Sequence, residues 1–152
     1  MNSEISIRLA NQDDAAALVQ FNQAMALETE GKTLDPQILG SGVESVFHDV
    51  KKGFYVVAED DGKIVGGLMI TYEWSDWRDN WFWWIQSVYI LPEYRGRRIY
   101  SLLYEFVKNE AENQGDVCGF RLYVEHDNFK AQQVYEKLGM QKSHYLMYEE
   151  MV

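Results

Sequence analysis

The fold is decided by residues 86–100, which read QSVYILPEYRGRRIY. The stretch opens as an apolar strand, passes through Pro92, and then turns on a glycine and arginines before a helical pattern begins. A helix start leaves backbone N–H groups unpaired and carries a partial positive charge, so an anion fits there. Arg95, Arg97 and Arg98 add positive charge at the same place. The stretch therefore predicts a strand, loop and helix that grip a phosphate.

The helix after this turn has one apolar stripe. Its members recur at helical spacing and are Ile99, Leu102, Leu103, Phe106 and Val107. A stripe of this kind packs on a sheet and leaves the start of the helix pointing outward.

The rest of the chain alternates between segments with the two-residue period of a strand and segments with the 3.6-residue period of a helix. Strands are expected at residues 5–9, 54–58, 64–72, 81–90, 120–125 and 145–149, and helices after Asn11, Asp35 and Asn128. We expect an α/β or α+β fold, with a mixed, mostly antiparallel central sheet of about six to seven strands and helices on both faces. The first two helices would form a flap over one end of the sheet.

Length and composition favour one domain spanning residues 1–152. The formal charge of −10 argues against a nucleic-acid partner and is compatible with a cationic substrate, although solubility explains it as well. No segment is long and apolar enough for a membrane helix, and the first residues lack a signal peptide, so a cytoplasmic protein without a membrane partner is expected. One cysteine and three isolated histidines predict no metal site.

A second motif follows near the end of the chain. Residues 128–140, NFKAQQVYEKLGM, place Asn, Ala, Tyr and Gly at spacings of three, four and four. Together with the arginine loop, this motif resembles a GNAT superfamily N-acetyltransferase, and the resemblance covers nearly the whole chain in element order. It implies acetyl-CoA as co-substrate, held in a cleft where the fourth and fifth strands splay apart.

The resemblance also assigns roles to residues. Backbone groups of Val88, Tyr89 and Ile90 would pair with the pantetheine arm, and one of their amides would polarise the thioester carbonyl. Asn128 would hydrogen-bond the same arm, and Tyr135 would protonate the departing thiolate. The pyrophosphate would be held by the arginine loop, namely Arg95, Gly96, Arg97, Arg98, Ile99, Tyr100 and Ser101.

Two loop positions depart from the family pattern. Arg98 stands where the family has glycine, which tolerates positive φ, and Tyr100 stands where it has a small residue. We expect Arg98 to take a helical conformation and to place its guanidinium on a phosphate. Tyr100 is expected either to line the channel or to pack sideways against the helix.

The proton acceptor and the amine site are less well specified. Many family members have a glutamate where this chain has Gln86, which cannot act as a base. Glu73 is the nearest acidic alternative as the base, with Glu28 or Glu30 in the flap also possible, and a water chain ending at any of them would serve. Glu28 and Glu30 are also expected to contact the substrate. Trp74 and Trp77, near Glu73 and Asp76, could form an aromatic and acidic wall for a cationic amine.

The resemblance therefore implies transfer of an acetyl group to a primary amine, in a small molecule, by direct attack in a ternary complex. A non-catalytic CoA-binding regulatory module and an acetyltransferase for protein amines are the alternatives. Exposed strand edges and the many aromatic residues favour a homodimer.

Overall fold

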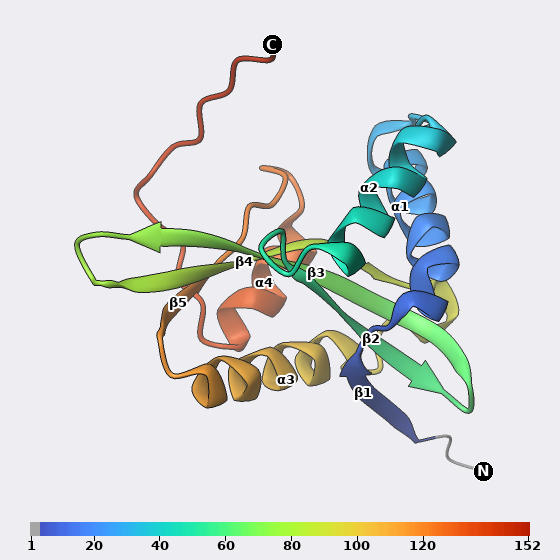
Figure 1. Ribbon diagram of the computed structural model, residues 1–152, viewed down its shortest axis with the longest axis horizontal. Helices are drawn as coiled ribbons and strands as arrows, with labels where there is room; N and C mark the ends of the chain where they lie inside the picture. The colour runs from blue at the N-terminus through green and yellow to red at the C-terminus, as the bar shows by residue number, and fades with distance from the viewer. Residues whose placement is uncertain (1–3) are drawn as a thin grey trace. The chain divides into compact units, whose positions relative to one another are not determined.

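The computed structural model describes residues 4–152 (Figure 1). The chain divides after Leu122 into two compact units. The first unit contains the sheet and three of the four α-helices, and the second contains α4 (Phe129–Lys137). The expectation that residues 1–152 act as one domain stays a prediction.

The sheet of the first unit has five strands in the order β1-β2-β3-β4-β5. The first four pair antiparallel, and β4 and β5 pair parallel. This confirms the mixed, mostly antiparallel sheet, although it has fewer strands than expected. The strands are β1 (Ile5–Leu9), β2 (Phe54–Asp60), β3 (Lys63–Ser75), β4 (Asn80–Ile90) and β5 (Val117–Arg121).

Two strand predictions at the end of the chain were wrong. Residues 120–125 were expected to form a strand, but β5 begins earlier and ends at Arg121. Residues 145–149 are assigned to no strand. Their alternating side chains have strand propensity, but a strand forms only where a neighbour supplies hydrogen bonds, and within residues 4–152 none pairs with them.

Local turn and cap chemistry explains most of the element boundaries. Asp61 and Gly62, between β2 and β3, have φ of 47° and 82°, as a tight two-residue hairpin turn requires. Asn11 forms a capping box with Asp14 across the short helix η1 (Gln12–Asp14), which leads into α1 (Ala15–Glu30). Asp35 caps α2 (Pro36–His48), which begins with proline.

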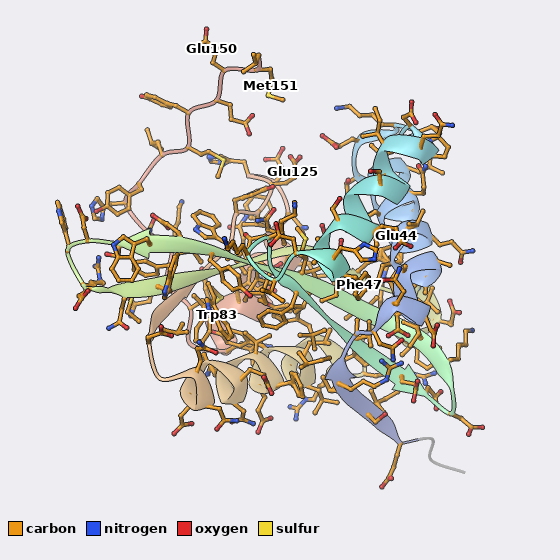
Figure 2. The ribbon with its side chains drawn as sticks, in the orientation of Figure 1. Glu44, Phe47, Trp83, Glu125, Glu150 and Met151 are labelled. Atoms are coloured by element: carbon orange, nitrogen blue, oxygen red, sulfur yellow. The ribbon has the colours of Figure 1, made fainter. Side chains whose placement is uncertain are left out.

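Helices cover both faces of the sheet, as expected (Figure 1). On one face, Leu18 and Phe21 of α1 and Val43 of α2 pack against the strands. On the other face lies α3 (Ile99–Gln114), and Figure 2 marks Trp83 between the sheet and this helix. The buried stripe of α3 includes Ile99, Tyr100, Leu103, Tyr104 and Val107, whereas Leu102 is exposed, contrary to expectation.

The second unit consists of α4 and irregular segments. The side chain of Asn128 accepts a hydrogen bond from the amide of Ala131 at 3.2 Å and thereby caps α4. Gly139, with φ of 99°, follows the helix end. Gln132 also ties the helix to its own N-terminal loop by donating to the carbonyl oxygens of Glu125 and His126. None of the helices within residues 4–152 is both long and apolar enough to cross a membrane.

Candidate functional site

Halfway along β4, the strand loses one of its two neighbours. It pairs with β3 as far as Ile90 but with β5 only from Trp81 to Trp84. Beyond Trp84, no other strand in the described part of the chain occupies the β5 side of β4. The backbone of residues 85–90 therefore offers an open sheet edge, which is a place where an extended chain can bind.

A bulge lies in the same stretch of β4. Gly67 pairs with Tyr89 and Met69 with Gln86, so Ser87 and Val88 both lie opposite Leu68. Ser87 has φ of 53°, a conformation that non-glycine residues rarely adopt. A bulge bends the strand and redirects its backbone groups, so it contributes to the separation of β4 from β5.

The predicted phosphate loop follows β4 directly. It passes through the short helix η2 (Pro92–Tyr94) and through Gly96, which has φ of 79°, before α3 begins at Ile99. Leu102 donates the first hydrogen bond of this helix, to the carbonyl of Arg98 at 3.2 Å. The amides of residues 99–101 therefore have no acceptor within the helix, and they form a positively polarised helix start.

Arg98 does not adopt the expected helical conformation. Its φ and ψ are 63° and 23°, in the left-handed region that glycine occupies at low cost. The loop thus keeps the backbone shape that a glycine would give and stores strain of about 1–2 kcal/mol at an arginine.

Tyr100 packs against its own helix, which is one of the two expected alternatives. It is buried and stacks on Tyr104 of the same helix, with the ring centroids 6.1 Å apart. The guanidinium of Arg97 lies over the ring of Tyr94, 4.9 Å from its centroid. The Tyr94 hydroxyl in turn donates to Asp60 at 2.7 Å, so the loop is attached to the β2–β3 hairpin.

Arg95 connects the loop to the flap. Its Nε donates to the carbonyl oxygen of Ile90 at 2.9 Å, and its Nη2 lies 3.0 Å from Glu28 Oε2 near the end of α1. The Tyr89 hydroxyl donates to the other oxygen of Glu28 at 2.8 Å. Hydrogen bonds from Tyr89 and Arg95 hold the pKa of Glu28 below its ordinary value. The predicted substrate residue Glu28 therefore contacts the predicted phosphate loop, whereas Glu30 pairs loosely with Lys32 at 3.7 Å.

A strip of polar side chains lies on the sheet face that also carries α1 and α2. Met69, which packs in the core beneath these helices, shares its face with Thr71 and Glu73 because side chains alternate along β3. Gln86 Nε2 donates to Thr71 Oγ1 at 2.5 Å. The indole Nε1 of Trp84 donates to Glu73 Oε1 at 2.9 Å. This polar strip follows β4 to the point where the strands separate.

Arg121 completes the polar strip. Its Nη1 lies 2.8 Å from the same Glu73 oxygen, and its guanidinium lies over the ring of Phe82 at 3.6 Å. That ring fits against Gly119 of β5, where an added Cβ would lie 2.8 Å from it. Burial raises the pKa of Glu73, but the hydrogen bonds from Trp84 and Arg121 outweigh this effect and hold the pKa below its ordinary value. Glu73 is therefore ionised at neutral pH.

Of the two tryptophans predicted to bind substrate, Trp74 lies on the sheet face opposite to Glu73. Trp74 contacts Trp81 at 4.9 Å between ring centroids, on the α3 side of the sheet and opposite to Glu73. Trp77, in the turn between β3 and β4, is 87% exposed. Strand alternation separates Glu73 from Trp74, so Trp74 does not join Glu73 in the expected aromatic and acidic wall.

A hollow of about 450 Å³ also lies on the α3 side. Its lining includes Phe54, Tyr72 and Trp83 together with Glu110 and Asp116. None of the predicted site residues contributes to it. None of the residues of the open edge or of the arginine loop therefore lines this hollow.

The second unit carries two predicted site residues, Asn128 and Tyr135. Asn128 uses its side-chain oxygen as the cap of α4, and its amide nitrogen is a separate donor. Burial raises the pKa of Tyr135, so its hydroxyl stays protonated at neutral pH. Within residues 4–152, no group of three or more His, Cys, Asp or Glu side chains is arranged to hold a metal ion.

Sequence reasoning found the loop but missed Arg121, Phe82 and Thr71. The side chains of these residues lie close together because β3, β4 and β5 pair in a particular register, which sequence spacing does not reveal. One signal was available, because alternation within β4 already places Trp84 on the face opposite to Trp81 and Trp83. A charged residue inside a predicted strand, as Arg121 is, was a second signal.

Comparisons with family models and with solved structures point to the same family. A model of the acetyltransferase (GNAT) family matches residues 17–140. The crystal structure of a possible acetyltransferase from Clostridium difficile 630 is 44% identical, with 97% of each chain covered and a TM-score of 0.89. A search of curated proteins found no match.

Two more distant structures share the fold. A transcriptional regulator from Bacillus halodurans C-125 is 22% identical, with coverage of 97% and 100% and a TM-score of 0.84. The aminoglycoside N-acetyltransferase AAC(6')-Iy in complex with CoA is 15% identical, with coverage of 99% and 97% and a TM-score of 0.79. Since the family model spans most of the chain and the Clostridium protein is 44% identical, this chain belongs to the GNAT acetyltransferase family.

Proposed function

We propose that this protein transfers the acetyl group of acetyl-CoA to a primary amine of a small molecule, by direct attack in a ternary complex. One observation carries the proposal: the open edge of β4 leads directly into a loop with free amides and three arginines. A strand edge suits the amide-containing pantetheine arm, and a helix start suits the pyrophosphate. The strand edge and the helix start follow one another along the chain, just as the pantetheine arm and the pyrophosphate are joined to one another in CoA.

The chemistry and backbone conformation of the arginine loop support its assignment to the pyrophosphate. Amides of residues 96–101 are the proposed donors, as the resemblance implies, and the left-handed backbone of Arg98 keeps the loop in the form a glycine would give. Arg95, Arg97 and Arg98 supply fixed positive charge. Arg95 Nη2 already bonds Glu28, so a phosphate would compete with that carboxylate for this nitrogen.

The open edge is proposed to hold the pantetheine arm through backbone groups of Val88, Tyr89 and Ile90. The bulge at Ser87 and Val88 interrupts the pairing with β3 at the start of this stretch, and Tyr89 and Ile90 resume it with Gly67 and Gly66. An amide directed at the thioester carbonyl there would stabilise negative charge on that oxygen in the transition state. Asn128 is proposed to add a hydrogen bond to the arm from the start of α4.

Proton transfer is assigned to two side chains. Glu73, ionised because of its hydrogen bonds, is proposed to accept the proton of the attacking amine directly or through a water. Tyr135, kept protonated by burial, is proposed to protonate the sulfur. The reaction forms a bond from the amine nitrogen to the acetyl carbon and breaks the carbon–sulfur bond, whose electron pair leaves on sulfur.

A second candidate is a CoA-binding module without catalysis. It is favoured by Gln86, which bonds Thr71 and offers no base at the position where many family members have glutamate. Thiol release from acetyl-CoA with a panel of amines separates the two candidates. Release that depends on an amine supports the enzyme. CoA binding without release for any small or protein amine supports the module.

Cytoplasmic location and a homodimer also belong to this proposal. The outer edge of the terminal strand β1 and the exposed apolar side chains of the C-terminal segment, such as Tyr148 and Met151, favour self-association. The molar mass of the protein, measured by light scattering as it elutes from a size-exclusion column, tests the dimer. A monomer at micromolar concentration would contradict it.

A further inference from the structure

Arg121 lies at the point where β4 and β5 separate. It is the last residue of β5, and it pairs with Trp84, the last residue of β4 that still has a β5 neighbour. The next residues of β4 belong to the open edge. A ligand group held by Arg121 would therefore sit beside the point at which the two strands separate.

The charges around Arg121 are unusual for an acidic protein. Arg121 and Arg78 lie over the ring of Phe82, at 3.6 and 5.0 Å from its centroid. Within residues 4–152, the one acidic side chain that bonds either arginine is Glu73. This cluster of Arg78, Arg121 and Glu73 has an excess of positive charge in a chain whose formal charge is −10.

The guanidinium of Arg121 also has unused binding capacity. It bonds Glu73 through Nη1 only, although an arginine can hold a carboxylate with two parallel hydrogen bonds. Its Nη2 and Nε donate to no other residue within the described chain. The side chain is 31% exposed, so a ligand can approach it.

Two opposite charges side by side match a zwitterion. An α-amino acid carries its ammonium and its carboxylate on the same carbon, and Glu73 and Arg121 present the complementary charges 2.8 Å apart. The partly buried ring of Trp84 borders the same pair, whereas the Phe82 ring is buried beneath the guanidinium of Arg121. A simple cationic amine has no negative group that could pair with the excess positive charge of Arg78 and Arg121.

We propose that the acyl acceptor is an amino acid, or another amine that carries a carboxylate near its amino group, and that Arg121 binds this carboxylate. The inference rests on the proposed acetyl transfer and adds the class of substrate. Arg121 fixes the carboxylate, which leaves the amino group beside Glu73, the proposed proton acceptor.

Matched pairs of acceptors test this assignment. Each pair consists of an L-amino acid and the amine that remains when its carboxylate is removed, such as phenylalanine and phenethylamine. Thiol release from acetyl-CoA is measured for the wild-type protein and for Arg121→Gln, Arg121→Lys and Lys108→Gln. Lys108 is the matched control, because it is also a cation over an aromatic ring, at 4.7 Å from Tyr104, but on α3.

The wild type should prefer at least one amino acid over its decarboxylated partner by about 10- to 100-fold in kcat/KM, as expected for a charged hydrogen-bonded contact. Arg121→Gln should abolish that preference mainly by raising KM for the amino acid. Arg121→Lys should restore part of it, and Lys108→Gln should retain it. Titration with acetyl-CoA, expected to give the wild-type affinity, shows that the variants are folded.

Several results would overturn the inference. These are equal rates with both members of every pair, a preference that survives in Arg121→Gln, and a protein that binds acetyl-CoA but acetylates no amine bearing a carboxylate. Failure of the wild type to bind acetyl-CoA at all is a different result, because it removes the proposed function as well.

Discussion

The contact between Glu28 and Arg95 leads to a quantitative prediction about cofactor affinity. Arg95 Nη2 lies 3.0 Å from Glu28, and the side chains are 46% and 41% exposed. Before Arg95 can bind a phosphate with this nitrogen, the ion pair must open. Replacing Glu28 with glutamine removes the competing charge but keeps an oxygen that accepts the hydrogen bond of Tyr89.

The size of the effect follows from the exposure of the pair. An exposed ion pair contributes about 0.2–1 kcal/mol, so its removal should tighten CoA binding by about 1.4- to 5-fold. Loss of a negative charge near the phosphates acts in the same direction, and added salt should reduce the gain. Isothermal titration with CoA at low and at high salt measures both effects.

Glu30→Gln provides the control for the Glu28 experiment. Glu30 lies on the same helix and makes only a 3.7 Å contact with Lys32. The Glu30→Gln variant should therefore bind CoA with nearly unchanged affinity. An unchanged or weaker affinity in Glu28→Gln would refute the reasoning, and so would an equal gain in both variants, since that gain would come from overall charge.

Two further predictions concern stability. Asp14 is nearly buried and bonds Arg8 through both carboxylate oxygens, at 2.7 and 3.0 Å, so Asp14→Asn should lower the free energy of unfolding by about 2–3 kcal/mol in denaturant titrations. Burial raises the pKa of Asp14, but hydrogen bonds from Arg8 and the Asn11 amide outweigh it and lower the pKa. This stabilisation is therefore complete above the unfolded-state pKa of about 3.9 and is lost as pH falls through the lower folded-state value, so the variant and the wild type should converge in acid. Arg98→Gly should raise the free energy of unfolding by up to about 1 kcal/mol, because glycine takes φ of 63° without strain but adds freedom to the unfolded chain; a destabilised variant would contradict the strain at Arg98.

Local signals in the sequence predicted the parts of the fold that depend on neighbouring residues. The Asp61-Gly62 turn, the caps at Asn11 and Asp35, and the helix after the arginine loop each follow from residues within a few positions of one another. Their physics is local, so spacing and residue type suffice to place them.

The errors concern contacts between distant segments. The pair of Glu28 and Arg95 joins residues that are far apart in sequence, and the network of Glu73, Trp84 and Arg121 depends on the register of three strands. Arg98 takes a left-handed backbone because the loop geometry outweighs its own preference for helix. Such features depend on tertiary structure, and neither periodicity nor composition contains them.

The central claim is that the arginine loop and the open edge of β4 bind acetyl-CoA. The most direct test is isothermal titration of the wild type and of an Arg95→Ala, Arg98→Ala double variant with acetyl-CoA and with CoA. We predict binding in the micromolar range by the wild type and at least about tenfold weaker binding by the double variant, since each lost phosphate contact is charge-assisted. No binding by the wild type, or equal binding by both proteins, would contradict the claim.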